Sequence, residues 1–213
     1  MKRLSLILIT AGAILMLFPI AREYYYDWEQ QQLLNEMEDS SLPINNELTN
    51  KHVATEYEQL SSIFNGSAEE SSPDQTSITD MNDKAIAVIT IDKIDLKLAV
   101  LEGATLKNMK VGAAHMTETA PLGEIGNAAI AAHRARTKGR QFNRLNEMEV
   151  GDDISIRTKD STLIYTVDKI SVVKPTDLSV LEGNNKDAIL TLITCEPLVN
   201  PTHRLIVHAK MVK

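Results

Sequence analysis

Short segments rich in β-branched residues follow one another from residue 85 to the end of the chain. They lie at 85–91, 96–101, 127–132, 152–158, 162–173, 188–194 and 203–211. Several alternate apolar with polar residues, as strands with one buried face do, and turn-forming Gly, Pro and Asn residues separate them. Only two short helices are expected, at 105–110 and 139–148. The pattern predicts a mainly β fold, a closed or nearly closed barrel with short helices.

The first 22 residues are predicted to be a membrane anchor. Lys2 and Arg3 precede an uncharged stretch of 18 residues, 4–21, and a helix of that length nearly crosses a hydrocarbon core of about 30 Å. The stretch exceeds the roughly 7–15 apolar residues of a cleaved signal and has no small-residue cleavage site after it, which favours an uncleaved anchor. Because basic residues mark the cytoplasmic side, the sequence predicts a single-pass protein with its N-terminus in the cytoplasm and its remainder outside.

Residues 23–83 differ in composition from both of their neighbours. They are rich in Gln, Glu, Asn, Ser and Asp and contain few apolar residues for a core. A few helical turns are expected directly after the anchor, because Leu33, Leu34 and Met37 recur at helical spacing. The segment is predicted to be a flexible extracellular stalk, with an ordered subdomain as the alternative. The domain proper is predicted at 84–213, which is near the usual domain size.

Composition and motifs argue against several kinds of function. The net charge of −7 argues against nucleic-acid binding, which requires basic patches. The sequence has no glycine-rich phosphate loop and no Cys/His set with zinc spacing. Glu102, Glu118 and Glu124 are acidic enough to attract calcium, but they lack the dense oxygen-ligand spacing of an EF-hand and are expected to be solvated. The sequence therefore predicts no metal and no cofactor.

Cys195 is the only cysteine in the chain, so no intramolecular disulfide is expected. It ends an apolar, β-branched run, and a buried structural residue is its simplest interpretation. Pro197 and Pro201 bracket a loop, and the next strand begins near His203. If the two strands are neighbours, Arg204 lies close to Cys195. Its guanidinium would there hold a carbonyl group or stabilise the oxyanion that forms when a thiolate attacks it.

A nucleophilic cysteine also needs a base or a positive charge nearby, because a free thiol has a pKa of roughly 8.5. His52 lies in the predicted stalk and is expected to be solvated. His203 should point away from the face used by its neighbour in the strand, and His208 lies about 13 Å further along. His115 and His133 remain, and the residues alone barely separate them. His133 has the better position, since it ends an apolar strand just as the cysteine does.

Two segments carry motifs that belong together. "TLITC" ends at Cys195, and Arg204 follows after a short loop. Upstream, "VGAAHMTETAPLGEIGNAAIAAHR" at 111–134 combines a Gly-x-x-His segment, a Pro-x-Gly-Glu-x-Gly-Asn turn and a His-Arg pair. In this combination and chain order the sequence resembles the sortases, the membrane-anchored cysteine transpeptidases of Gram-positive bacteria. One position departs from the family's pattern, because Ala132 stands where glycine is usual.

The resemblance implies a fold and a set of site residues. It implies an eight-stranded sortase-type β-barrel with short helices over 84–213, preceded by the transmembrane helix and the stalk. Cys195 would be the nucleophile, His133 would transfer protons at the leaving and incoming amines, and Arg204 would stabilise the oxyanion. Three further residues are expected to bind substrate: His115, Thr191 and Thr194.

The resemblance also implies substrates. The enzyme would cleave an LPxTG- or LPxTA-like sorting signal after its Thr, through a Cys195 thioester. It would then transfer the secreted surface protein to an amino group of a peptidoglycan precursor (lipid II). Membrane lipid would be a further partner, in contact with the N-terminal helix. The overall pattern looks most like class D, with the housekeeping class A as the alternative. The lack of an obvious lid motif before the barrel argues against the pilus-polymerising class C.

Three rival interpretations fit the residues less well. An L,D-transpeptidase carries a Ser-x-Gly-Cys segment, which Cys195 lacks. A cysteine protease that only hydrolyses is chemically close and differs in the partition of its intermediate between amine and water. A non-catalytic wall-binding barrel with a structural cysteine gives no reason for the His133 and Arg204 motifs to occur together.

Overall fold

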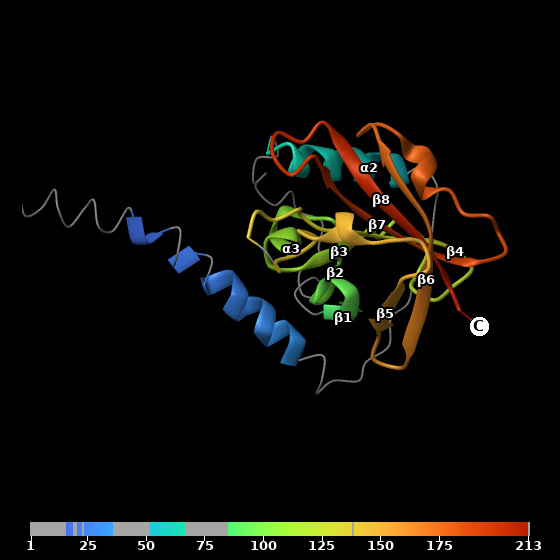
Figure 1. The fold of residues 1–213 in the computed structure, drawn as a ribbon, viewed down its shortest axis with the longest axis horizontal. Helices are drawn as coiled ribbons and strands as arrows, with labels where there is room; N and C mark the ends of the chain where they lie inside the picture. The colour runs from blue at the N-terminus through green and yellow to red at the C-terminus, as the bar shows by residue number, and fades with distance from the viewer. Residues whose placement is uncertain are drawn as a thin grey trace, which may run out of the picture.

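The barrel predicted from the strand pattern is the centre of the fold. The computed structural model describes residues 16–18, 21–22, 24–35, 52–66, 85–137 and 139–212. Its strands are β1 (Ala85–Ile91), β2 (Leu96–Glu102), β3 (Ala113–His115), β4 (Gly126–Ala131), β5 (Asp153–Arg157), β6 (Thr162–Val173), β7 (Ala188–Glu196) and β8 (His203–Met211). They close in the order β1-β2-β3-β4-β7-β8-β6-β5 (Figure 1). The mainly β, eight-stranded barrel is therefore confirmed.

Two details of the predicted elements differ. The three-residue strand β3 was not expected, and it is too short for an alternation pattern to be visible in the sequence. The predicted helix at 139–148 is instead a series of turns that ends in the 3-10 helix η2 (Leu145–Glu147). The other expected helix is present as α3 (Leu106–Val111), whose first turn is capped by the Thr105 side chain.

The barrel has an apolar interior and a second apolar layer outside it. Alternate residues of a strand face opposite sides, so β7 sends Leu190 and Leu192 inward and Ile193 and Cys195 outward. All eight strands contribute residues to the interior, β3 through Ala113, and Phe142 joins them from the turns after β4. The outer layer lies over β4, β7 and β8, where a helix covers it.

That covering helix is α2 (His52–Phe64), which lies alongside β7 and β8 in Figure 1. Tyr57, Leu60, Ile63 and Phe64 are buried in the same cluster as Cys195. From its composition, this segment was predicted to belong to a flexible stalk. The structure instead makes it part of the folded domain, because its few apolar residues share one face of a helix and bury that face on the barrel.

A second segment of the predicted stalk is also packed on the barrel. Residues 24–35 are helical, and Leu33 and Leu34 are buried against a cluster that includes Val88 and Leu101. The other residues of 23–83 lie outside the described ranges. Within the described residues, no helix is long and apolar enough to cross a membrane. Most of the predicted anchor at 1–22 lies outside those residues.

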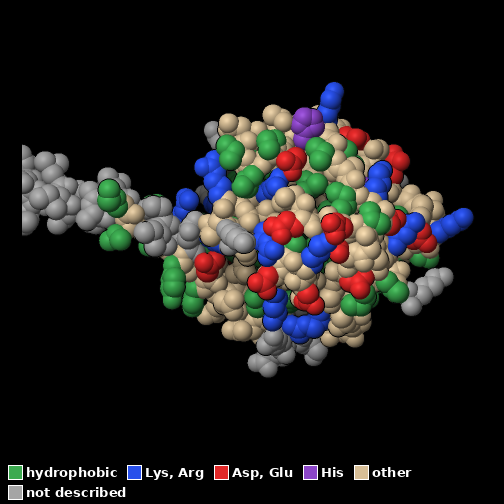
Figure 2. Space-filling view, viewed as in Figure 1, with side chains coloured by type: hydrophobic (Ala, Val, Ile, Leu, Met, Phe, Trp, Pro, Cys, Tyr) green, Lys and Arg blue, Asp and Glu red, His purple; other side chains and the backbone are tan. Residues whose placement is uncertain are grey.

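The outer surface of the barrel carries both signs of charge. On the face shown in Figure 2, Lys and Arg side chains are interspersed with Asp and Glu side chains. Several of them pair, as Lys93 does with Glu149 at 2.6 Å and with Asp152 at 2.9 Å. A mixed surface of this kind gives no strong field of one sign on that face.

Candidate active site

Three neighbouring strands bring Cys195, His133 and Arg204 into one row. Cys195 is directly paired with Arg204 in the antiparallel ladder of β7 and β8. β4 runs parallel to β7 with Ala131 opposite Ile193, so His133, two residues further on, is level with Cys195. Paired residues of adjacent strands face the same side of a sheet, which puts Arg204 on the outer face together with the thiol. The predicted proximity of Cys195 and Arg204 is confirmed.

The backbone before His133 is tied to the strand that carries Cys195. The Ala132 N–H donates to the Ile193 carbonyl at 3.1 Å, and the Thr194 hydroxyl donates to the Ala132 carbonyl at 2.8 Å. These two bonds continue the β4–β7 pairing one residue beyond β4. They fix where His133 leaves the sheet, and they give the fully buried Thr194 a positioning role.

A second link joins the residues that follow the histidine and the cysteine. The Arg134 guanidinium pairs with the Glu196 carboxylate and also donates to the Cys195 carbonyl at 3.4 Å. The side chain of Arg134 is 8% exposed, so the pair is largely shielded from solvent. It holds the loop after β4 against the end of β7.

The end of α2 covers this row. The Phe64 ring packs edge-on against His133 with ring centroids 5.6 Å apart, and the Arg204 guanidinium carbon lies 5.0 Å from the Phe64 centroid. Asn65 accepts a hydrogen bond from Arg204 Nη2 at 3.3 Å. An aromatic ring edge and a π-face over a cation are both favourable contacts. The sequence shows no obvious lid motif before the barrel, yet the end of α2 covers the site in the structure.

Burial sets the protonation states of the covered site. Burial raises the pKa of the Cys195 thiol, an effect that the charges of Arg204 and Arg134 only partly oppose. Burial also lowers the pKa of His133. Both shifts favour the neutral forms, because a low-dielectric environment disfavours charge. Burial of the covered site therefore disfavours a thiolate–imidazolium ion pair.

Arg204 is a buried cation that is held by few partners. It is 1% exposed, and it donates from Nη1 to the His203 carbonyl at 3.1 Å in addition to its bond to Asn65. Burial lowers its pKa, although a guanidinium stays protonated throughout the physiological range. Once Asn65 moves away, the donors of Arg204 are free to bind an oxygen beside Cys195.

His115 and Thr191 lie in the same sheet but have other partners. The His115 ring faces the Glu102 carboxylate at 3.0 Å through Nδ1 and the Ala120 carbonyl at 3.0 Å through Nε2. The Thr191 hydroxyl donates to Asn127 Oδ1 at 2.6 Å. Both side chains are buried and use their polar atoms within the protein. The geometry brings neither of them to the Cys–His–Arg row.

The acidic residues considered for calcium are dispersed. Glu102 is engaged with His115, and Glu118 and Glu124 lie in and after the turn that follows β3. Within the described ranges, no group of three or more His, Cys, Asp or Glu side chains is arranged to hold a metal ion.

Sequence reasoning missed the contribution of α2 to the site. Residues 57, 60 and 64 are apolar at intervals of three and four, which is the pattern of a one-faced helix. That pattern was available in the sequence but was outweighed by the polar composition around it. The Arg134–Glu196 ion pair could not be predicted for another reason, because its two residues lie far apart in the chain.

Comparisons with known proteins identify the family. Residues 89–212 match the family model described as Sortase domain. Sortase A of Bacillus anthracis is 32% identical over 160 residues, which cover 74% of this chain and 75% of that protein. Sortase A of Listeria monocytogenes is 24% identical over 215 residues, which cover 100% of this chain and 91% of that protein.

Solved structures give the same result. The Clostridium perfringens sortase D5 transpeptidase is similar with a TM-score of 0.57 and 34% identity, over 62% of this chain and 81% of that one. Sortase C-1 of Streptococcus pneumoniae shares the fold with a TM-score of 0.64 at 23% identity, over 87% and 98% of the two chains. The matched region contains the whole row of Cys195, His133 and Arg204, and the chain belongs to the sortase family of cysteine transpeptidases.

Proposed function

We propose that this protein anchors surface proteins to the cell wall by transpeptidation, with Cys195 as nucleophile, His133 as acid and base, and Arg204 as oxyanion-binding residue. The observation that carries the proposal is the row formed by these three residues at the ends of β4, β7 and β8. A nucleophile, a proton carrier and a fixed cation around one carbonyl are the groups that acyl transfer requires.

The first half of the reaction forms a thioester. The Cys195 proton passes to His133, and the thiolate attacks the carbonyl carbon of the Thr residue in the sorting signal. Arg204 donates to the oxyanion. The C–N bond to the following Gly or Ala then breaks, and the leaving amine takes the proton from His133. An acyl group remains on the sulfur.

The second half transfers the acyl group to an amine. An amino group of a peptidoglycan precursor attacks the thioester carbonyl, so that a C–N bond forms and the C–S bond breaks. The amine loses a proton to the neutral His133, which returns it to the departing thiolate. The energy of the original peptide bond is kept in the thioester, so no nucleotide is needed.

The substrate and the location follow from the family resemblance. An LPxTG- or LPxTA-like signal is the proposed substrate, and 1–22 is the proposed single-pass anchor with the barrel outside the cell. The exposed apolar side chains of Met16, Leu17 and Phe18 support an anchor, because water-exposed residues of this kind are costly. Class D is the proposed subclass, supported by the 34% identity to a class D structure, with class A as the alternative.

Incubation of the full-length protein in detergent micelles with LPETG and LPETA peptides and a small amine tests the proposal. Mass spectrometry should find a covalent acyl adduct on Cys195 and a peptide cleaved after Thr and joined to the amine. The matched variants are Cys195→Ala, which should form neither species, and Arg204→Lys, which keeps the charge but should lose about 100-fold in rate because it lacks the planar fork. Cleavage without transfer would favour a hydrolase, and intact peptides would contradict the proposed signal.

A further inference from the structure

Asn65, which joins the end of α2 to Arg204, stands directly before a glycine. Asn65–Gly66 is the only Asn-Gly pair in the chain, and both residues are exposed. They follow Phe64, the last residue of the helix. Gly66 has a φ of +68°, and apart from its chain neighbours no atom lies within 4 Å of the position that a Cβ would take. Without a side chain of its own, Gly66 leaves its backbone nitrogen sterically open to the Asn65 side chain.

An asparagine before a glycine loses ammonia without the help of another enzyme. The backbone nitrogen of the glycine attacks the side-chain amide carbon, so that a C–N bond closes a five-membered succinimide. The C–N bond to the amide nitrogen breaks, and ammonia leaves with the proton of the backbone N–H. Water then opens the ring and leaves a carboxylate on the residue, as aspartate or isoaspartate. In this protein the Gly66 N–H first has to give up its hydrogen bond to the Ile63 carbonyl, which is 3.1 Å long.

Arg204 lies where it promotes this reaction. Its Nη2 donates to Asn65 Oδ1 at 3.3 Å, and the amide has to present its oxygen there because a guanidinium carries only donors. Attack on the amide carbon moves negative charge onto that same oxygen. A fixed donor directed at a developing oxyanion lowers the barrier of such a step. The contact that Arg204 would offer to a substrate oxyanion is therefore already made with Asn65.

The product of the reaction would suit Arg204 better than the amide does. Arg204 is 1% exposed, and its contacts are the His203 carbonyl, the Asn65 amide and the Phe64 ring. None of these contacts supplies a negative charge. A carboxylate on residue 65 would replace a neutral acceptor with a charged one, and charge-assisted hydrogen bonds are about twice as strong as neutral ones.

We propose that Asn65 is a deamidation site, and that its carboxylate product pairs with Arg204 and holds the end of α2 over the Cys–His–Arg row. The enzyme would in this way close its own site as it ages. The loss of activity rests on the proposed function, in which Arg204 binds the substrate oxyanion. The modification and the tighter helix do not rest on it.

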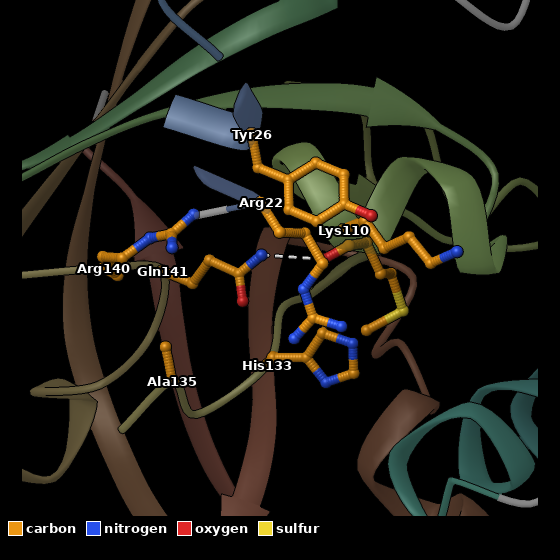
Figure 3. A pocket seen from close by; sticks show the side chains of 8 residues that line it. Arg22, Tyr26, Lys110, His133, Ala135, Arg140 and Gln141 are labelled. Carbon is orange, nitrogen blue, oxygen red and sulfur yellow. Dashed lines mark hydrogen bonds between the residues drawn. The ribbon is translucent and has the colours of Figure 1, made fainter. Parts of the chain in front are cut away.

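The change at Asn65 would act on the Arg204 side of the site. The His133 ring also lines a pocket of about 140 Å³, to which Gln141 contributes (Figure 3). Neither Phe64 nor Asn65 belongs to the described lining of that pocket. A carboxylate on residue 65 would therefore restrain the cover at Arg204 and leave this approach to the histidine open.

Mass mapping of the aged protein tests the modification. Full-length protein in detergent micelles is kept in a mildly alkaline buffer, and its proteolytic fragments are compared over time. The fragment that contains Asn65 should lose ammonia, gain water and so become one mass unit heavier. Asn200 is an internal control that should stay unchanged, because Pro201 has no N–H proton to give up. In Arg204→Gln the change at Asn65 should be at least tenfold slower.

A synthetic peptide Ile-Phe-Asn-Gly-Ser shows how fast the pair reacts without the fold. If the peptide deamidates while Asn65 of the protein stays intact, the fold protects the residue, and the proposal is overturned. An equal or faster change in Arg204→Gln would contradict the part given to the guanidinium.

Two variants at residue 65 test the consequence. Asn65→Asp reproduces one product, so hydrogen exchange of the amides in 52–66 and acyl-enzyme formation with an LPETG peptide should each slow about tenfold. Asn65→Gln keeps an amide but would need a six-membered ring to react, so it should retain its starting rate during ageing while the wild type declines. Gln59→Glu adds the same charge at an exposed position of α2 and should change neither measurement.

The two readouts keep the proposals apart. Unchanged exchange in Asn65→Asp would show that the carboxylate does not hold the helix, and would overturn the inference. Slower exchange with an unchanged rate of acyl-enzyme formation would overturn the claim that the product closes the site. Absence of acyl-enzyme in the fresh wild type would contradict the proposed function itself, while mass mapping and hydrogen exchange would still decide on Asn65.

Discussion

The Phe64 ring lies over the Cys–His–Arg row of the site. It contacts His133 and Arg204, and it belongs to the apolar cluster that buries Cys195. The raised pKa of the thiol and the lowered pKa of the imidazole both come from burial. In the proposed reaction, a substrate carbonyl would take the space next to Arg204 that Phe64 and Asn65 occupy in the structure.

Replacement of Phe64 by Ala should therefore activate the thiol. Less burial lowers the pKa of Cys195, and each unit of decrease raises the thiolate fraction below that pKa about tenfold. We expect faster alkylation by iodoacetamide between pH 6 and 8, with the pH profile displaced toward lower pH. Gln59→Ala, an exposed change on the same helix, is the control. An identical pH profile in Phe64→Ala would contradict the role given to this ring.

His115 is a buried residue whose protonation should affect the stability of the fold. Both of its ring nitrogens face acceptors, Glu102 and the Ala120 carbonyl, so both must carry protons for the two bonds to form. The contacts with Glu102 raise the pKa of His115 against the opposing effect of burial. A raised folded-state pKa stabilises the protein fully below the unfolded value of about 6.5, and this contribution disappears as pH rises through the folded value.

Urea unfolding of the wild type and His115→Gln at a series of pH values measures this contribution. The difference in unfolding free energy should be largest below about pH 6.5 and should shrink above it, by about 1.4 kcal/mol for each unit by which the pKa is raised. Glu56, whose pKa is raised by burial, interacts electrostatically with His115, so the same series in a Glu56→Gln background separates its titration from that of the histidine. A difference that grows with pH would show that the ring is neutral in the folded protein.

At the scale of elements, α2 is attached to the barrel by a carboxylate as well as by its apolar face. Glu56 accepts hydrogen bonds from the backbone N–H groups of Thr117 and Glu118, both at 2.9 Å, and from that of Ala104 at 3.5 Å. Thr117 and Glu118 lie in the loop after β3, and Ala104 lies in the loop between β2 and α3. The helix is thus joined to the barrel near its start by Glu56, and near its end by Phe64 and by the hydrogen bond between Asn65 and Arg204.

Glu56→Ala should loosen α2 without removing it. Hydrogen bonds to charged groups contribute about 1.5–3 kcal/mol each, offset here by the cost of burying the carboxylate. We expect hydrogen exchange of the amides in 52–66 to accelerate at least tenfold while the strands keep their protection. The exposed Glu58→Ala on the same helix should exchange like the wild type. Equal exchange in both variants would show that the apolar face alone holds the helix.

The strands were predictable and the covering helices were not, for a physical reason. β7 and β8 are long, β-branched and joined by a proline-containing loop, so their pairing and the approach of Arg204 to Cys195 follow from the chain itself. The choice of His133 over His115 needed the family motif, because both histidines follow apolar runs. In α2, only one face is apolar, and the average composition of the segment concealed it.

For the whole molecule, the described helices before the barrel belong to the folded unit. Residues of 24–35 and 52–66 complete two apolar clusters on the outside of the barrel. Each buried Leu, Ile or Phe side chain stabilises the fold by about 1.5–3 kcal/mol. The predicted boundary at residue 84 would leave the barrel's share of both clusters exposed to water.

A fragment that starts at residue 85 should therefore be less stable than one that starts at residue 24. We expect a lower Tm, stronger binding of an apolar dye and a tendency to aggregate, because Ile193, Ile206 and Leu101 lose their cover. Differential scanning fluorimetry and light scattering on the two fragments provide the comparison. Equal Tm values would mean that the clusters contribute little.

The docked helix also limits how far an anchored enzyme reaches. A flexible segment spanning 23–83 would extend up to about 200 Å at roughly 3.3 Å per residue, enough to sweep a thick layer of wall. With Leu33 and Leu34 held on the barrel, the link from residue 22 to the barrel is one helix of about 18 Å for 24–35. Under the proposed anchor, both substrates must come to the membrane surface, and the enzyme works at the place where newly exported proteins and lipid-linked precursors emerge.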